Sequence, residues 1–154
     1  MLKKFQNKYL FKGNLKPDNA VCVIITYKGK MLLQKRDNKK NIFFPNYFGL
    51  FGGAIEKKET KLNAIQREIF EELNIFIEKK RFNYLTSIKI DFFKIIKKKF
   101  ERTFYYFEIR DNEIKNIKLR EGSAMIWSNL YDNYANIKLV PYDSFAIWLY
   151  LFKK

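Results

Sequence analysis

Four glutamates and one arginine are spaced within a single segment in a way that could bind a cation. Residues 53–75 read GAIEKKETKLNAIQREIFEELNI, and they contain, in order, Gly53, Glu59, Arg67, Glu68, Glu71 and Glu72. Carboxylate oxygens are hard ligands, which suit Mg²⁺ or Mn²⁺ better than softer metals. The chemistry therefore depends on whether one structural element brings these side chains together.

The element expected to position them is a helix over residues 61–73. Thr60 can cap its first turn, no Gly or Pro interrupts it, and Asn74 is suited to end it. Side chains follow one another at about 100° around a helix. The apolar residues on one stripe are therefore expected to pack against a sheet, and they are Leu62, Ile65, Ile69 and Leu73.

The three glutamates of this helix would be crowded beside that stripe. Glu68 and Glu72 are four residues apart and project within roughly 40° of each other, with Glu71 one position round. Their repulsion is costly unless protons or a cation neutralise it, which favours a divalent metal site. Arg67 can reach Glu71 one turn later or fork onto Glu59 from the preceding loop. The alternative is a solvated acidic helix face held by ion pairs.

The segment resembles the signature of the Nudix hydrolases. That signature reads Gly, five residues, Glu, seven residues, Arg-Glu, an apolar residue, any residue, Glu-Glu, any residue, Gly and an apolar residue. The chain matches it except at the last glycine, which is Asn74, and asparagine is the next most tolerated residue at a left-handed helix end. The resemblance implies an α/β fold, a Nudix-type α/β/α sandwich with a mixed β-sheet, forming a single domain over residues 1–154.

The resemblance also implies roles for the site residues. Glu68, Glu71 and Glu72 would bind Mg²⁺ or Mn²⁺, with the Gly53 carbonyl as a fourth ligand, and Arg67 would hold the loop and orient the glutamates. Divalent ions there would neutralise a pyrophosphate and lower the pKa of bound water. Attack of that water on phosphorus would release two phosphorylated products.

A second match to the family lies further along the chain. The stretch LREGSAMIWSNL, residues 119–130, resembles a family segment in which a loop glutamate precedes a strand. This makes Glu121 a further metal ligand or the general base, and Glu71 and Glu68 are the other candidates for the base. Because the position varies within the family, three more glutamates remain as alternatives: Glu101, Glu108 and Glu113.

Three residues are candidates for contact with the substrate. Arg36 follows an expected strand, where the family often has an arginine, and it could contact phosphate or be a surface cation. Tyr47 and Phe48 could stack on a base, although a place in the core or pocket wall is the stronger interpretation.

The composition excludes several other mechanisms. The chain has no histidine, which excludes Ser-His and Cys-His catalysis and histidine-based zinc sites. Its one cysteine, Cys22, lies in the apolar run AVCVIITY and is expected to be buried in a strand. A single thiol cannot form an intramolecular disulfide, which suggests a reducing, cytoplasmic location. The longest apolar run, FAIWLYLF, is too short to span a bilayer.

The apolar runs predict a sheet around the acidic helix. Strands are expected at residues 20–27, 31–35, 82–90, 100–109 and 124–127, with a short strand within 47–51. A hairpin should join the first two strands at residues 28–30, and Pro141 should open a helix at 142–152. Strands divided by one helix and followed by another are typical of an α/β/α sandwich.

The expected function is that of a Mg²⁺-dependent pyrophosphohydrolase, which cleaves the diphosphate linkage of a nucleoside diphosphate or triphosphate derivative. A small nucleotide is favoured because no extra RNA-binding module is visible. The net charge of +15 attracts polyphosphates, but the excess of Lys, Asn, Ile, Phe and Tyr is also what AT-rich codons produce. Two alternatives stay open, a non-catalytic basic nucleotide- or RNA-binding protein of this fold and an RNA 5′-end pyrophosphohydrolase. Dimers are common among relatives, so a homodimer is an open option.

Overall fold

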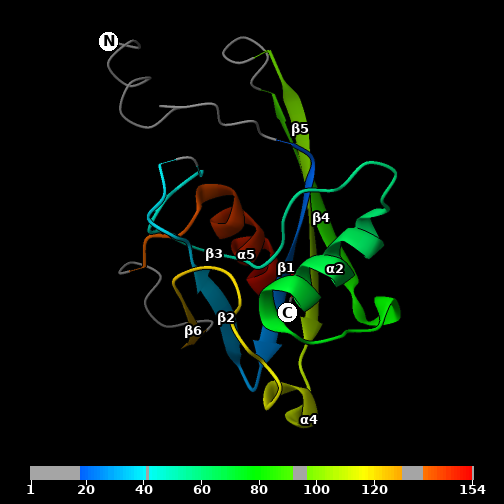
Figure 1. Cartoon of the computed structure of the whole chain (residues 1–154), viewed down its shortest axis with the longest axis vertical. Helices are drawn as coiled ribbons and strands as arrows, with labels where there is room; N and C mark the ends of the chain where they lie inside the picture. The colour runs from blue at the N-terminus through cyan, green and yellow to red at the C-terminus, as the bar shows by residue number, and fades with distance from the viewer. Residues whose placement is uncertain (1–17, 41, 92–96, 130–136, 154) are drawn as a thin grey trace.

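The computed structural model describes residues 18–40, 42–91, 97–129 and 137–153, which form a mixed sheet and helices. The strands are β1 (Ala20–Tyr27), β2 (Lys30–Lys35), β3 (Phe48–Gly49), β4 (Asn83–Asp91), β5 (Lys99–Glu108) and β6 (Ala124–Asn129). The helices are α2 (Lys61–Leu73), the 3₁₀ helix η1 (Lys79–Arg81), α4 (Asp111–Ile114) and α5 (Pro141–Lys153). The predicted α/β/α sandwich is confirmed, with α2 and α5 on opposite faces of the sheet (Figure 1).

The sheet is mixed because one pair of strands is parallel. Its order is β3-β2-β1-β5-β4, and β6 pairs with the other edge of β2. β1 and β5 run parallel, whereas the other paired strands run antiparallel. The turn at Lys28 and Gly29, both with positive φ, joins β1 to β2 as the predicted hairpin.

The segment from Phe48 to Ala54 fills a gap in the middle of this sheet. β1 pairs with β2 only over its last residues, Ile25 to Tyr27. Beyond that point β2 pairs with β3, while Phe51 and Ala54 bridge to the first half of β1. The strand predicted within 47–51 is therefore shorter than expected, since the residues after Gly49 change partner from β2 to β1. This change of partner places the next two glycines, Gly52 and Gly53, beneath α2.

Successive side chains of β1 point to opposite faces of the sheet, so β1 contributes to the core on both sides. Val21, Val23 and Ile25 pack with α2, whereas Cys22 and Ile24 pack with α5. The names α2 face and α5 face are used below for these two sides of the sheet. Cys22 is 1% exposed, as predicted for a buried strand residue.

Helix α2 begins and ends where the sequence predicts. The Thr60 side chain accepts a hydrogen bond from the backbone N–H of Asn63 at 3.2 Å, and Asn74 ends the helix in the left-handed conformation. The prediction that Leu62 belongs to the buried stripe is wrong, because Leu62 is 36% exposed. The buried side of the helix includes Ala64 and Glu72. It is therefore rotated away from Leu62, which lies at the edge of that side in the first turn.

The apolar character of α5 does not make it a membrane span. Over the part of the chain that is described, no helix is both long and apolar enough to cross a bilayer.

Candidate active site

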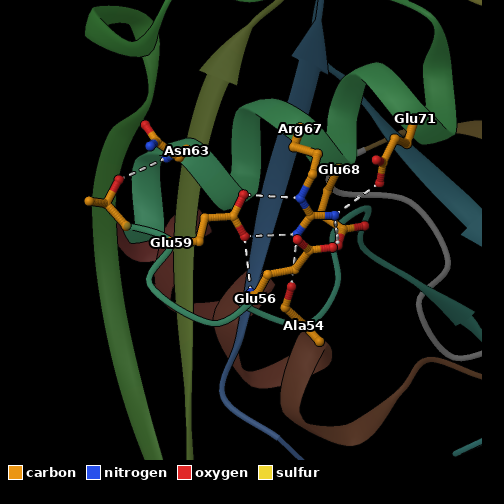
Figure 2. Close-up of polar contacts among 8 residues, drawn as sticks. Ala54, Glu56, Glu59, Asn63, Arg67, Glu68 and Glu71 are labelled. Atoms are coloured by element: carbon orange, nitrogen blue, oxygen red, sulfur yellow. Dashed lines mark hydrogen bonds and ion pairs between the residues drawn. The ribbon is translucent and has the colours of Figure 1, made fainter.

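Arg67, in the middle of α2, is the centre of a charged cluster formed by the helix and the loop before it. Its Nε and Nη2 donate to the two carboxylate oxygens of Glu59, both at 3.0 Å. Its Nη1 donates to Glu68 at 2.8 Å and to Glu71 at 2.9 Å, and Nη2 also donates to the Ala54 carbonyl at 3.0 Å. Figure 2 shows the guanidinium between the loop and the helix, in contact with both. Both predicted options for Arg67, Glu71 and Glu59, are therefore realised at once.

The forked contact with Glu59 dominates the electrostatics of the loop. Hydrogen bonding from Arg67 is the largest cause that lowers the pKa of Glu59, and Glu59 is the largest cause that raises the pKa of Arg67. Glu59 also accepts a hydrogen bond from the backbone N–H of Glu56 at 3.1 Å. The loop before α2 is thus fixed by the same guanidinium that holds two glutamates of the helix.

Glu72 is buried beneath the helix, at 5% exposure. One carboxylate oxygen accepts from Gln34 Nε2 at 2.9 Å and the other from the backbone N–H of Gly52 at 2.8 Å. Burial raises the pKa of Glu72 to about 8, with further increases from the charges of Glu68 and Glu121, against the two hydrogen bonds. Both oxygens of Glu72 have a protein donor, so this carboxylate is held in one orientation.

Two glycines permit close approaches at the site, Gly52 to the β1 backbone and Gly53 to a carboxylate. Gly52 has φ +130°, and a Cβ there would lie 2.1 Å from the Val21 carbonyl oxygen. A Cβ on Gly53 would lie 2.5 Å from Glu68 Oε1, so the Glu68 carboxylate occupies the space that a side chain would fill. The Gly53 carbonyl accepts from Val21 N–H at 2.9 Å, and its second lone pair is left for another donor or a cation.

Glu68 and Glu121 complete the acidic cluster from two directions. Burial is the largest cause that raises the pKa of Glu68, opposed by Arg67 and supported by the charges of Glu71 and Glu121. Glu121 lies in the loop before β6, where its backbone carbonyl accepts from Gln34 Nε2 at 3.1 Å. Because Gln34 binds both Glu72 and the Glu121 backbone, the loop that carries Glu121 lies beside the helix, and the charge of Glu121 adds to the rise in the pKa of Glu68 and Glu72.

The other candidate glutamates lie elsewhere. Glu101 pairs with Lys61, and Glu113 pairs with Arg81 beside α4. Glu108 is exposed at the end of β5. Glu121, by contrast, is among the charges that raise the pKa of both Glu68 and Glu72.

The carboxylates of the cluster face protein donors instead of one common point. Across residues 18–40, 42–91, 97–129 and 137–153, no group of three or more His, Cys, Asp or Glu side chains has a geometry that could hold a metal ion. Glu68 and Glu71 each turn one oxygen toward Arg67, and their other oxygens have no hydrogen bond to a described residue. The donor set still fits a hard divalent cation, because three glutamates around one guanidinium, with Glu72 close by, leave an excess of carboxylate charge.

The predicted substrate residues lie beside the loop that leads into β3. Arg36 donates from Nε to the Phe43 carbonyl at 2.8 Å, and it is half-buried. The Tyr47 ring packs against Phe44 at 5.5 Å between centroids. Phe48 is partly buried against the α5-face core, which fits the interpretation as core or pocket wall.

Gln34 was not identified from the sequence. It is a buried residue of β2 that donates to Glu72 and to the Glu121 loop, so it links two parts of the cluster. The available signal was an uncharged polar residue after the buried run Met31 to Leu33. A polar side chain in such a place needs a buried partner.

The chain is similar to known proteins in sequence and in fold. The family model described as NUDIX domain matches residues 15–143. An uncharacterised Nudix hydrolase of Listeria monocytogenes is 32% identical over 102 residues, which are 66% of this chain and 54% of that protein. The chain therefore spans about half the length of this curated relative.

Solved structures have the same fold. The MutT NUDIX hydrolase from Burkholderia pseudomallei is 25% identical with a TM-score of 0.70, and the match covers 87% of this chain and 98% of that one. A bifunctional NMN adenylyltransferase/ADP ribose pyrophosphatase from Francisella tularensis, complexed with AMP and a manganese ion, is 20% identical with a TM-score of 0.64. That match covers 99% of this chain and 46% of the other.

Proposed function

Since the chain belongs to the Nudix family, we propose that it is a pyrophosphohydrolase that cleaves the diphosphate linkage of a nucleoside diphosphate or triphosphate derivative. The observation that carries the proposal is the arrangement around Arg67. One guanidinium orients Glu59, Glu68 and Glu71, while Glu72 is held separately by Gln34 and Gly52. A purely structural ion pair would need only one carboxylate for Arg67. The additional negative charge of the other carboxylates favours binding of a positively charged ligand.

The residues that would hold Mg²⁺ or Mn²⁺ are Glu68, Glu71, Glu72, Glu121 and the Gly53 carbonyl. When bound, the cation would supply charge neutralisation at the phosphates and a lower pKa for the attacking water. The manganese ion in the Francisella tularensis structure supports this choice of metal.

The chain's own carboxylates divide the remaining work. Glu72 has a protein donor on each oxygen, which suits a fixed ligand better than a base. Glu68, Glu71 and Glu121 remain the candidates to take the proton of the attacking water. In the reaction, the water oxygen bonds to phosphorus, the bridging P–O bond breaks, and the displaced phosphate carries away the electron pair.

The favoured substrate is a small nucleotide. The formal net charge of +15 favours approach of a polyanion. The AMP in the Francisella tularensis structure supports a nucleotide ligand for this fold. Arg36 would contact phosphate, and Tyr47 would contribute an aromatic surface beside it. The single buried cysteine suits a reducing compartment such as the cytoplasm.

The test is the substitution Glu72→Gln against a panel of nucleoside diphosphate and triphosphate derivatives with Mg²⁺. The amide keeps the size of Glu72 and removes its charge, so hydrolysis should fall at least about 100-fold while the far-UV circular dichroism spectrum stays unchanged. Glu108→Gln is the matched control, since Glu108 is exposed at the end of β5. Equal turnover in wild type and Glu72→Gln would reject the site.

A basic protein that binds nucleotides or RNA without hydrolysis is the second candidate, favoured by the charge of +15. It predicts binding that weakens steeply with salt and no metal-dependent release of products. A substrate at an RNA 5′ end would instead give turnover on triphosphorylated RNA that exceeds turnover on free nucleotides.

A further inference from the structure

Three large aromatic side chains are exposed along the outer side of α5. Phe145 is 48% exposed, Trp148 is 51% exposed and Phe152 is 73% exposed. They are three and four residues apart, so they project within roughly 60° of one another on the helix. The ring centroids lie 5.9 Å apart for Phe145 and Trp148, and 4.7 Å apart for Trp148 and Phe152. These three residues form one continuous surface, called the aromatic stripe below.

The packing of α5 on the sheet does not depend on the aromatic stripe. The opposite side of the helix packs on the sheet through Ala146, Ile147 and Tyr150, which are at most 4% exposed. A surface helix typically carries charged or polar residues opposite its buried side. Here that position is taken by aromatic rings, and contiguous apolar patches of about 300–600 Å² are often functional. The stripe is therefore a candidate contact surface.

The stripe is too small for a stable contact with another protein. A fully covered aromatic side chain buries about 200 Å², so the exposed parts of the three rings amount to about 350 Å². A specific interface between proteins buries about 800 Å² on each partner. A second copy of this chain is disfavoured further, because each copy has a formal net charge of +15 and the two would repel each other.

The exposed charges next to the stripe are positive. All residues of α5 are described, and its one acidic residue, Asp143, is 2% exposed. Lys153 in the last turn is exposed, although its Nζ donates to the Tyr106 hydroxyl at 3.0 Å. Lys138, three residues before the helix begins, is also exposed. The stripe thus has a lysine near each end, which suits a surface that is apolar inside and anionic at its boundary.

We propose that the aromatic stripe of α5 binds the surface of an anionic lipid membrane. Aromatic side chains are favoured at the boundary between headgroups and acyl chains, and the rings enter a lipid surface without a matching groove. Lys138 and Lys153 then lie at the level of the lipid phosphates, and the net charge of the chain attracts it to the membrane. The helix lies along the surface and does not cross the bilayer.

Binding through α5 leaves the acidic cluster open to the solution. Helices α5 and α2 lie on opposite faces of the sheet (Figure 1). When α5 lies on the lipid, α2 and its glutamates therefore face away from it. The inference goes beyond the proposed function and does not depend on it.

The first experiment measures co-sedimentation of the full chain with vesicles of phosphatidylcholine alone or of an equimolar mixture with phosphatidylglycerol. We expect binding to the anionic vesicles and much weaker binding to phosphatidylcholine alone. Trp148→Ser and Phe152→Ser should each weaken binding about 10-fold, because each removes one ring and leaves the buried side of α5 intact. Tyr84→Ser is the matched control, since Tyr84 is an aromatic residue of β4 that is 57% exposed and lies outside the stripe.

The second experiment observes the stripe directly by fluorescence. The chain has two tryptophans, so Trp148 is the only one in the variant Trp127→Phe. Its emission should shift to shorter wavelength when anionic vesicles are added, and brominated lipids should quench it. The stripe is intact in this variant, so the measurement does not depend on the folding of the serine variants.

Three results would overturn the inference. The first is an absence of binding to anionic vesicles, together with unchanged Trp148 emission. The second is equal binding by wild type, Trp148→Ser and Phe152→Ser, which would show that charge alone attracts the chain to lipid. The third is self-association in sedimentation velocity that both serine substitutions abolish, without vesicle binding, which would assign the stripe to a second copy of the chain.

Discussion

Charged side chains are buried on both faces of the sheet, but their hydrogen bonds are completed to different extents. On the α2 face, Arg67 donates to three carboxylates and a carbonyl, and Glu72 has a donor for each oxygen. On the α5 face, Arg102 and Asp143 each keep one buried atom without a partner among the described residues. The α2 face is thus preassembled by the protein, whereas two buried polar atoms on the α5 face keep unused hydrogen-bonding capacity.

This difference predicts different consequences of substitution. A preassembled cluster is part of the fold, so its loss should lower stability and activity together. A group with unsatisfied hydrogen-bonding atoms contributes less to the fold, so its loss should cost less stability. Substitutions on the two faces therefore test this contrast.

Two adjacent glycines separate the role of the fold from the role of the site on the α2 face. Gly52→Ala should lower the unfolding free energy by at least about 3 kcal/mol, since its Cβ would meet the backbone at a φ that L residues rarely adopt. Gly53→Ala should cost only about 1 kcal/mol, because the Cβ meets the flexible tip of Glu68. It should nevertheless lower turnover at least about 10-fold by displacing that carboxylate. Urea unfolding and initial rates measure both effects, and a fully active Gly53→Ala would show that the position of Glu68 is unimportant.

Arg67→Ala tests whether the acidic cluster is part of the fold. The substitution leaves three carboxylates without their donor, so we expect a loss of about 2 kcal/mol in urea unfolding, together with lower turnover. Arg67→Lys should recover part of the stability but little of the activity, because an ammonium cannot fork onto Glu59 and reach the helix at the same time. Wild-type stability in Arg67→Ala would contradict the contrast between the two faces.

The contacts of Arg67 on the α2 face could be predicted from the sequence because the residues that make them are close together in the chain. The spacing from Gly53 to Glu72 fits one loop and one helix, so the contacts of Arg67 with Glu59 and Glu71 follow from local geometry. The cap at Thr60 and the end at Asn74 are local for the same reason. The strands were also predictable, since their apolar runs are continuous.

The remaining features depend on pairing between distant segments. Gln34 reaches Glu72 and the Glu121 loop only because β6 lies beside β2. Tyr142, the neighbour of Asp143, contacts Arg102 with its ring only because α5 packs on the face of the sheet where this residue of β5 lies. Neither contact leaves a period or spacing in the sequence, so both residues were overlooked.

Asp143 gives a pH-dependent test of the α5 face. Burial raises its pKa from 3.8 to about 6, against the effects of Arg102, the Leu50 N–H and Arg36. The folded protein holds this proton more tightly than the unfolded chain, so its contribution is full below about pH 4 and is lost as the pH rises through about 6. Asp143→Asn removes the effect, so the variant should gain up to about 3 kcal/mol relative to wild type over that interval.

Urea unfolding at successive pH values between 4 and 7 measures this difference, with Asp111→Asn as the control. Asp111 is exposed, and hydrogen bonds from Tyr27 and Lys28 lower its pKa, so its contribution should be lost as the pH falls. Because this loss occurs below about pH 3.8, the difference for Asp111→Asn should stay nearly flat between pH 4 and 7, while the difference for Asp143→Asn changes. If the difference in unfolding free energy between Asp143→Asn and wild type does not change with pH, the carboxyl group of Asp143 is not buried as described.

The smallest expected effect concerns Asn74, where the chain departs from the family signature. Asn74 has φ 57°, and its side chain accepts a hydrogen bond from Arg120, in the segment that leads to Glu121. Asn74→Gly should change stability by only about 0.5 kcal/mol, because the easier left-handed conformation offsets the lost contact. Asn74→Ala loses both advantages and should cost about 1 kcal/mol. Turnover should change less than about twofold in either variant, since the backbone N–H of Arg120 still binds the Glu72 carbonyl at 2.8 Å. A large loss of activity in both variants would mean that the helix end, and not Gln34, positions the Glu121 loop.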